Sequence, residues 1–378
     1  MIPIQGTINP EVIERELAGL WQKQARANQS DLHPGDERAT MRARVANLMV
    51  YVANEAALTE VNEVLKELSV RHPCRALVMI GAREKPDRDI EISVASFCHE
   101  QSEKSARPLC CEEVSLIAQG RFVVELASAT LPLLVPDLSV FLWWRDDVKT
   151  LESFPELLKR ADRIIIDSAD FANAGLELGA LRNLFSRAEE KGASISDMNW
   201  ARLTSWRAML AAFFDAASNR AALEQIKSVQ LDYAAGEVGV APGAQPLLIA
   251  GWLADRLGWK VSGQSGGSPG FHDVRFSKDE QEIVAEFHPV EGTQLQPGRL
   301  AGVRLETVSS IVFEVKRSPD GAHLAASVNG EQSINRGRVS PSHTRSVADL
   351  LAGEMEILCR DRVWEAAVLK ATGQYRPR

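Results

Sequence analysis

Short apolar runs are the feature of this chain that most limits its fold. VANLMVYV spans residues 45–52, ALVMI spans 76–80 and RIIID spans 163–167. Runs of this length, bounded by polar segments, predict buried strands. A helical pattern over 56–69 lies between the first two runs, so these segments form a β-α-β unit with an expected right-handed crossover. We therefore expect an α/β N-terminal domain with a parallel-centred sheet.

The second half of the chain has a different pattern. Strand candidates and Gly- or Pro-containing turn signals alternate over 272–328. Helical patterns cover 201–217, 246–257 and 346–370. This arrangement predicts an α+β C-terminal domain with antiparallel strands.

The expected domain organisation has three parts. Residues 1–40 form an N-terminal helix, over 8–27, followed by a polar linker. Residues 41–192 form the α/β domain, and residues 193–378 form the α+β domain.

Composition excludes several classes of protein. The formal net charge of −8 argues against a nucleic-acid-binding protein, which would usually carry a basic face. No apolar run approaches the roughly 18–20 residues needed to cross a bilayer, and the N-terminus lacks the pattern of a signal peptide. The five cysteines are an odd number, which suits a reducing compartment. We expect a cytoplasmic protein that binds neither nucleic acid nor membrane.

The strongest metal candidate is a set of six cysteine and histidine residues. Their types suit zinc, but the set contains no CxxC pair. Adjacent residues on a strand point to opposite faces and rarely bind one ion together. We therefore expect no metal site and no cofactor. The six residues are His72, Cys74, Cys98, His99, Cys110 and Cys111.

Motifs for catalysis are also lacking. The glycine-rich segment 262–270 has neither the lysine nor the β-α context of a phosphate loop, and no GxSxG elbow is present. Asp167 and Asp170 follow a predicted strand and could hold a cation, but acidic residues there more often cap helices. The chain is more typical of a binding protein than of an enzyme.

Two adjacent tryptophans end a further predicted strand. Trp143 and Trp144 follow the apolar run 139–142, and charge begins at Arg145. Successive side chains of a strand point to opposite faces. We therefore expect at least one of the two indoles to be partly exposed and to contact a partner. The alternative is that both rings cap the core.

A helix that carries two further tryptophans is predicted near residue 200. Asp197 is a plausible N-cap, and the segment that follows presents Trp200, Arg202, Trp206 and Arg207. Tryptophan and arginine are enriched at interface hot spots. The alternative is that the two rings join the two domains and that an arginine pairs with an acid between them.

Four segments, in this order, resemble the glucose-6-phosphate dehydrogenase assembly protein (OpcA) family. The resemblance covers roughly 44–315, and Cys74 and Ser139 depart from the family's usual serine and proline. The segments are HPCR at 72–75, LPLLVPDLSVFLWW at 131–144, DMNWARLTSWR at 197–207 and AGWLA at 250–254.

The resemblance implies a non-catalytic regulatory protein of the oxidative pentose phosphate pathway. Such proteins bind glucose-6-phosphate dehydrogenase, promote its active oligomer and raise its substrate affinity. The motifs supply the candidate partner-binding residues, which are His72, Arg75, Trp143, Trp144, Trp200, Arg202, Trp206 and Arg207.

Two other functions stay open at this stage. One is an enzyme acting on a sugar phosphate, with His72, Arg75 and Asp137 at the C-terminal edge of the sheet. The other is a metabolite-sensing domain that reports to the partner.

Overall fold

A computed structural model gives the fold as two compact units. Unit 1 comprises Met1–Ile166, Arg187–Ser196 and Ser346–Cys359, and unit 2 comprises Asp167–Ser186, Asp197–Arg345 and Arg360–Arg378. The division of the chain into 41–192 and 193–378 as domains stays a prediction. The structure describes residues 2–4, 9–30, 41–42, 45–99, 109–236, 242–264, 273–318, 321–329, 331–332, 340–341, 345–357 and 359–373. Of the expected linker at 28–40, residues 28–30 belong to a helix, Pro10–Ser30, so this part of the prediction is wrong, and 31–40 lie outside the described residues.

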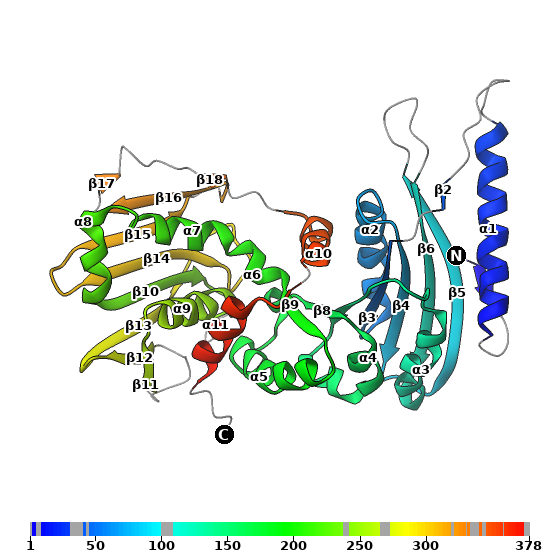
Figure 1. Ribbon diagram of the computed structural model, residues 1–378, viewed down its shortest axis with the longest axis horizontal. Coiled ribbons are helices and arrows are strands. Elements are labelled where there is room, and N and C mark those ends of the chain that lie inside the picture. The colour runs from blue at the N-terminus through cyan, green and yellow to red at the C-terminus, as the bar shows by residue number, and fades with distance from the viewer. Residues whose placement is uncertain are drawn as a thin grey trace. The chain divides into compact units, whose positions relative to one another are not determined.

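Unit 1 is built on a nine-stranded sheet, which Figure 1 shows nearly edge-on. The strand order is β1-β5-β6-β4-β3-β7-β8-β9, and β2 pairs with β6. Neighbours from β6 to β8 pair in parallel, whereas β5 is antiparallel to both β1 and β6. The parallel-centred sheet expected from the apolar runs is confirmed. The strands are β1 (Ile2–Ile4), β2 (Met41–Arg42), β3 (Ala46–Val52), β4 (Cys74–Ala82), β5 (Arg88–His99), β6 (Leu109–Gln119), β7 (Val140–Arg145), β8 (Arg163–Ile166) and β9 (Ser194–Asp197).

Burial on both faces explains the unbroken apolar runs of unit 1. Every residue of β3 and of β4 is buried, as expected for central parallel strands. Helix α1 lies alongside β5, and α2 packs against α10. The helices of this unit are α1 (Pro10–Ser30), α2 (Leu58–Leu68), α3 (Leu126–Thr130), α4 (Pro155–Arg160) and α10 (Val347–Glu356).

Some helices differ from the expected ones. Residues 120–133 contain the short α3 between two 3-10 turns, Gly120–Glu125 and Leu131–Leu133. The helix expected over 201–217 begins earlier, as α6 (Met198–Arg202), and continues as α7 (Thr204–Ala212). An unanticipated helix, α5 (Ala174–Glu190), follows β8.

The expected last helix over 346–370 is two helices, one in each unit. Helix α10 ends at an extended residue, Ile357, and α11 (Arg362–Thr372) begins five residues later. The Asp361 carboxylate accepts hydrogen bonds from the backbone nitrogens of Val363 and Trp364, at 3.0 and 2.9 Å. This second N-cap starts a new helix in the middle of the apolar pattern.

Unit 2 contains a second nine-stranded sheet, of order β11-β12-β13-β10-β14-β15-β16-β17, with β18 paired to β16. Only β10 and β13 pair in parallel, so the expected antiparallel C-terminal sheet is confirmed. The strands are β10 (Ile226–Ala234), β11 (Lys260–Gln264), β12 (Asp273–Lys278), β13 (Gln281–Val290), β14 (Leu300–Thr307), β15 (Val312–Arg317), β16 (His323–Val328), β17 (Glu331–Gln332) and β18 (Ser340–Pro341).

Helix α7 packs on β15 and α9 (Ala244–Arg256) packs on β10, while α11 packs against α9. The short helix α8 (Ala217–Arg220) follows α7. In β10, buried Val229, Leu231 and Tyr233 alternate with half-buried polar residues. That alternation is expected of a sheet with one packed face.

Helix α9 carries the AGWLA segment, and the packing of this helix explains why residue 251 is glycine. A Cβ atom on Gly251 would lie 2.1 Å from the backbone oxygen of Ala367 in α11. Only glycine lets the two helix backbones approach this closely.

Both tryptophans of the Trp-Trp strand are buried, so the expected exposure is wrong. Trp143 is 1% exposed and Trp144 is 2% exposed. Trp144 stacks on Tyr51 with ring centroids 4.2 Å apart, and its Nε1 donates to the backbone oxygen of Asp147 at 3.1 Å. Strand β7 lies between β3 and β8, where both faces of the sheet are covered. The side chains on both faces of β7 therefore lie in the core.

Replacing either tryptophan should destabilise the fold. We expect Trp143→Ala and Trp144→Ala each to lower the free energy of unfolding by about 3–5 kcal/mol, because each leaves a large cavity. Urea unfolding followed by circular dichroism measures the change. Val124→Ala, at a position that is 58% exposed, is the control and should change stability little. An unchanged midpoint for one tryptophan variant would contradict its burial.

A second substitution tests the helix contact. Gly251→Ala should lower the free energy of unfolding by about 1–3 kcal/mol, since α9 and α11 must separate to admit the methyl group. Gly353→Ala in α10 is a matched helical control, because nothing lies within 4 Å of its Cβ position. Equal melting temperatures for the two variants would argue against the close approach.

Candidate functional site

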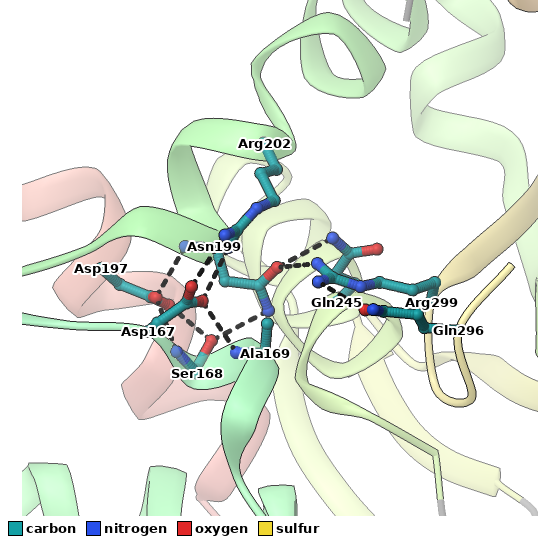
Figure 2. A network of polar contacts seen from close by, with 9 residues as sticks. All are labelled: Asp167, Ser168, Ala169, Asp197, Asn199, Arg202, Gln245, Gln296 and Arg299. Carbon is teal, nitrogen blue, oxygen red and sulfur yellow. Dashed lines mark hydrogen bonds and ion pairs between the residues drawn. The ribbon is translucent and has the colours of Figure 1, made fainter. Parts of the chain in front are cut away.

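The DMNWARLTSWR segment lies in a buried polar network within unit 2, which Figure 2 shows from close by. The network takes its side chains from segments far apart in the sequence. Asp167 and Ser168 follow β8, Asp197 ends β9, and Asn199 and Arg202 lie on α6. Gln245 lies in the first turn of α9, and Arg299 immediately precedes β14.

Asp197 is the buried carboxylate of this network. It is 2% exposed and caps α6 by accepting a hydrogen bond from the backbone nitrogen of Asn199 at 2.9 Å. It also accepts from the Ser168 backbone nitrogen at 2.9 Å and from the Ser168 hydroxyl at 2.6 Å. Burial, together with the negative charge of Asp167, raises the pKa of Asp197 to about 7. The expected N-cap is confirmed.

Asn199 links this carboxylate to the second half of unit 2. Its Nδ2 donates to the Ser168 hydroxyl at 3.0 Å. Its Oδ1 accepts from Gln245 Nε2 at 2.8 Å and from Arg299 Nη1 at 3.2 Å. Gln245 Oε1 in turn accepts from the backbone nitrogen of Leu300 at 2.9 Å. The network therefore joins α6, α9 and β14 through side-chain hydrogen bonds.

Arg202 pairs with Asp167 rather than pointing into solvent. Its two terminal nitrogens donate to the two carboxylate oxygens at 2.6 and 2.7 Å, which is a forked ion pair. The Arg202 side chain is 19% exposed and that of Asp167 is 8% exposed. Asp167 also accepts from the backbone nitrogen of Ala169, so it caps the turn that follows β8. Of the two roles considered for Asp167, capping is the one that these contacts give it.

Trp200 and Arg207 form a second contact within unit 2. The Trp200 indole donates to Asp361 Oδ2 at 2.8 Å, and the Arg207 guanidinium lies 3.6 Å from the centroid of the Trp200 ring. Burial lowers the pKa of Arg207 to about 10. Trp206 is 1% exposed. Both tryptophans are thus core residues of unit 2.

The HPCR segment supports unit 1 instead. Arg75 is 3% exposed and donates to Glu112 Oε2 from Nε and Nη2, at 3.1 and 2.8 Å. It also pairs with Glu14 of α1, and Trp21 of α1 donates to Glu112 at 2.7 Å. These contacts hold α1 against the sheet.

His72 is the more exposed residue of that segment. It lies 3.2 Å from Glu356 of α10 and is 19% exposed. His72 and Arg75 come before or at the start of β4, and Asp137 comes before β7. All three therefore lie at amino ends of parallel strands, and their expected position at the C-terminal edge is wrong.

The eight candidate residues are divided between the two units. Four of them, Trp200, Arg202, Trp206 and Arg207, lie in unit 2, and the other four lie in unit 1. Four members of the network were not among the predicted residues, namely Ser168, Asn199, Gln245 and Arg299. Asn199 stands inside the resembled motif and could have been chosen, whereas Gln245 and Arg299 carry no local signal.

The described part of the chain offers neither a metal site nor a membrane span. Within it, no group of three or more His, Cys, Asp or Glu side chains is placed to hold an ion. The side chains of Cys98, His99 and Cys110 lie outside that set, so the absence of a metal site stays a prediction. No helix of the described segments is long and apolar enough to cross a membrane.

Comparisons with known proteins give the family. Residues 65–183 match the N-terminal domain of the glucose-6-phosphate dehydrogenase subunit family, and residues 193–368 match the C-terminal domain of the same family. Together the two matches cover well over half of the chain, in the order of the family. The chain belongs to the OpcA family of glucose-6-phosphate dehydrogenase subunits.

Curated relatives carry the same family name and are assigned to the OxPP cycle. OpcA of Nostoc punctiforme is 30% identical over 258 residues, which are 67% of this chain and 50% of that protein. OpcA of Synechococcus elongatus is 27% identical over 310 residues, which are 80% of this chain and 67% of that protein. The chain thus spans about half the length of the first of these relatives.

Solved structures with a similar chain trace are oxidoreductases. One, from Sinorhizobium meliloti, is 14% identical with a TM-score of 0.43, and the match covers 88% of this chain and 89% of that one. A 3-ketoreductase from Actinomadura kijaniata is 12% identical with a TM-score of 0.46, and the match covers 87% and 95%. Likeness at this level carries no conclusion about activity.

The buried carboxylate makes a testable contribution to stability. Its pKa of about 7 exceeds the ordinary value of 3.8, so the folded chain binds this proton more tightly than the unfolded chain does. The stabilisation is fully present below about pH 4 and is lost as the pH rises through about 7. The loss is up to about 4 kcal/mol, at about 1.4 kcal/mol per pKa unit.

Asp197→Asn should therefore flatten the pH dependence of the unfolding free energy between about pH 4 and 8. Urea unfolding at intervals across this range measures it. Asp215→Asn, at an exposed position of unit 2, is the control and should keep the wild-type slope. A wild-type slope in Asp197→Asn would show that this carboxyl is not the titrating group.

Proposed function

We propose that this chain is a non-catalytic regulatory subunit of glucose-6-phosphate dehydrogenase. It binds that enzyme in the cytoplasm, promotes its active oligomer and raises its affinity for substrate, in the oxidative pentose phosphate pathway. The observation that carries the proposal is the match of both halves of the chain, in order, to the two domains of the dehydrogenase subunit family.

The contacts of the motif residues support a role in building a binding surface. Asp197 caps a helix, Arg202 holds Asp167 and Arg75 holds Glu112. Side chains fixed in this way give a rigid, preorganised surface, which lowers the entropy lost on association. A partner that binds one state of an enzyme more tightly shifts the enzyme toward that state, by its differential affinity alone.

Among the eight candidate residues, the half-buried ones are proposed to touch the partner. These are His72, Arg202 and Arg207, whereas the four tryptophans and Arg75 act by holding the fold. His72 is the most useful to test, because its side chain contacts a carboxylate that is 67% exposed. Such pairs contribute about 0–1 kcal/mol to stability, so replacing His72 should leave the fold intact.

Adding the chain should lower the apparent KM of the dehydrogenase from the same organism, or increase its oligomeric fraction. Initial rates over a range of substrate concentrations, and light scattering of the co-eluting complex, measure the two effects. The chain alone should convert no pentose-pathway metabolite. Unchanged kinetics without co-elution would contradict the proposal, and turnover by the chain alone would favour a sugar-phosphate enzyme instead.

His72→Ala should then weaken binding to the dehydrogenase without changing the melting temperature. Arg121→Ala, at a side chain of unit 1 that is 75% exposed, is the control. Equal affinity in both variants would show that His72 is not part of the proposed surface. The regulatory role would then still be tested by the kinetic experiment.

A further inference from the structure

The strand order of unit 1 has a switch point between β3 and β7, which pair in parallel. From β3 the chain moves outward to β4 and β6 on one side, and from β7 it moves to β8 and β9 on the other. Doubly wound sheets of this order hold a dinucleotide in the crevice outside the carboxyl ends of the two strands at the switch point. The fold of unit 1 therefore implies a dinucleotide cofactor, and the residues at this crevice decide whether one fits.

The turn after β3 lacks the features that bind a pyrophosphate. In a dinucleotide-binding turn, glycines let the backbone approach the pyrophosphate, which lies at the amino end of the following helix. Residues 53–69 contain no glycine. The Asn54 side chain instead caps the 3-10 turn Glu55–Ala57 by accepting a hydrogen bond from the backbone nitrogen of Ala57 at 3.1 Å. A backbone donor that could face a phosphate is thus already bound within the chain.

Carboxylates also stand at the amino end of α2. Glu55 lies in the 3-10 turn before the helix, and Glu60 lies in its first turn. Both oxygens of Glu60 accept from Arg145 Nη2 at 3.0 Å, a contact that joins the end of β7 to α2 across the switch point. Glu55 accepts from the Gln119 side chain at 3.1 Å. The positive end of the helix dipole therefore already faces carboxylates of the chain itself.

Aromatic rings fill the opposite face of the sheet at the same edge, because Trp144 and Arg145 are successive strand residues. Tyr51 lies near the end of β3, Trp144 near the end of β7, and Phe154 follows β7. All three rings are buried. The centroid of Phe154 lies 5.2 Å from that of Tyr51 and 5.7 Å from that of Trp144. The Tyr51 hydroxyl donates to the backbone oxygen of Gly81, near the end of β4, at 3.4 Å. The rings thus extend from β7 to β4.

Gly81 and Arg83 complete this closure. A Cβ atom on Gly81 would lie 2.6 Å from the Tyr51 hydroxyl oxygen, so the ring can lie here only because residue 81 is glycine. The guanidinium of Arg83, which follows β4, lies 5.2 Å from the centroid of the Phe154 ring. Side chains from the ends of β3, β4 and β7 therefore meet one another where a nucleotide would have to enter.

We propose that unit 1 has the strand order of a dinucleotide-binding domain but holds no dinucleotide, because its own side chains close the crevice at the switch point. The three rings, Arg83 and the Arg145–Glu60 pair take the place of the ligand. Any coenzyme in a complex with a dehydrogenase then belongs to the dehydrogenase, so the chain does not sense coenzyme levels itself. The inference does not depend on the proposed regulatory role, because it concerns the chain alone.

Energy transfer from tryptophan to NADPH, and isothermal titration calorimetry with NADP⁺ and NAD⁺, test the proposal on the full chain. No saturable signal should appear up to about 1 mM, the upper end of ordinary enzyme KM values. NADP⁺ should leave the melting temperature unchanged, since a ligand that does not bind the folded chain does not stabilise it. A dehydrogenase of known coenzyme affinity is the positive control. Saturable binding of any of the three dinucleotides to the wild-type chain would overturn the proposal.

Glu60→Gln separates closure by side chains from repulsion by charge. This variant removes one carboxylate from the amino end of α2 and should still bind no dinucleotide, because the rings stay in place. Glu63→Gln, at an exposed position of the same helix, is the matched control. Binding that appears in Glu60→Gln but not in the control would show that the crevice is open and would overturn the proposal. A lack of co-elution with the dehydrogenase, by contrast, would contradict the regulatory role and not this inference.

Discussion

A buried carboxylate is the constraint on which unit 2 most depends. Asp197 receives three hydrogen bonds, two of them from the backbone at the start of separate segments. Removing such a carboxylate from water costs several kcal/mol unless donors surround it. The donors are Ser168 and Asn199, and Asn199 then fixes Gln245 and Arg299. One buried carboxyl group whose oxygens are hydrogen-bonded only by protein thus helps to order α6, the start of α9 and the start of β14.

The sheets of the two units bury their apolar side chains in different patterns. In unit 1 the central strands are buried on both faces, so their sequences are apolar without alternation, and the Trp-Trp pair becomes core on both sides. In unit 2 burial alternates along the strands, as in β10, and polar side chains occupy the less buried face. The same dipeptide on a one-sided sheet would leave one ring in water.

Sequence patterns predicted the strands of the two sheets better than the boundaries of the helices. The buried strands β3, β4 and β8 and the antiparallel second half follow from the length and periodicity of apolar runs. Helix α5 was missed although Leu178, Leu181 and Phe185 recur at helical spacing, so the signal was present. The break between α10 and α11 depends on one capping aspartate, Asp361. This single residue is a weaker sequence signal than the helical periodicity on either side of it.

The polar network was predictable only in part, for a physical reason. Local chemistry marks Asp197 as a cap, because a carboxylate before a helix has a local role. Gln245 and Arg299 join the network through contacts with Asn199, which is 46 and 100 residues away in sequence. A long-range hydrogen bond leaves no periodicity, so the residues that make it look ordinary in isolation. The family motifs were misinterpreted for the same reason. Their tryptophans and arginines were expected at a surface, but most of them make long-range contacts in the interior. These buried pairs hold the interior of each unit in one arrangement.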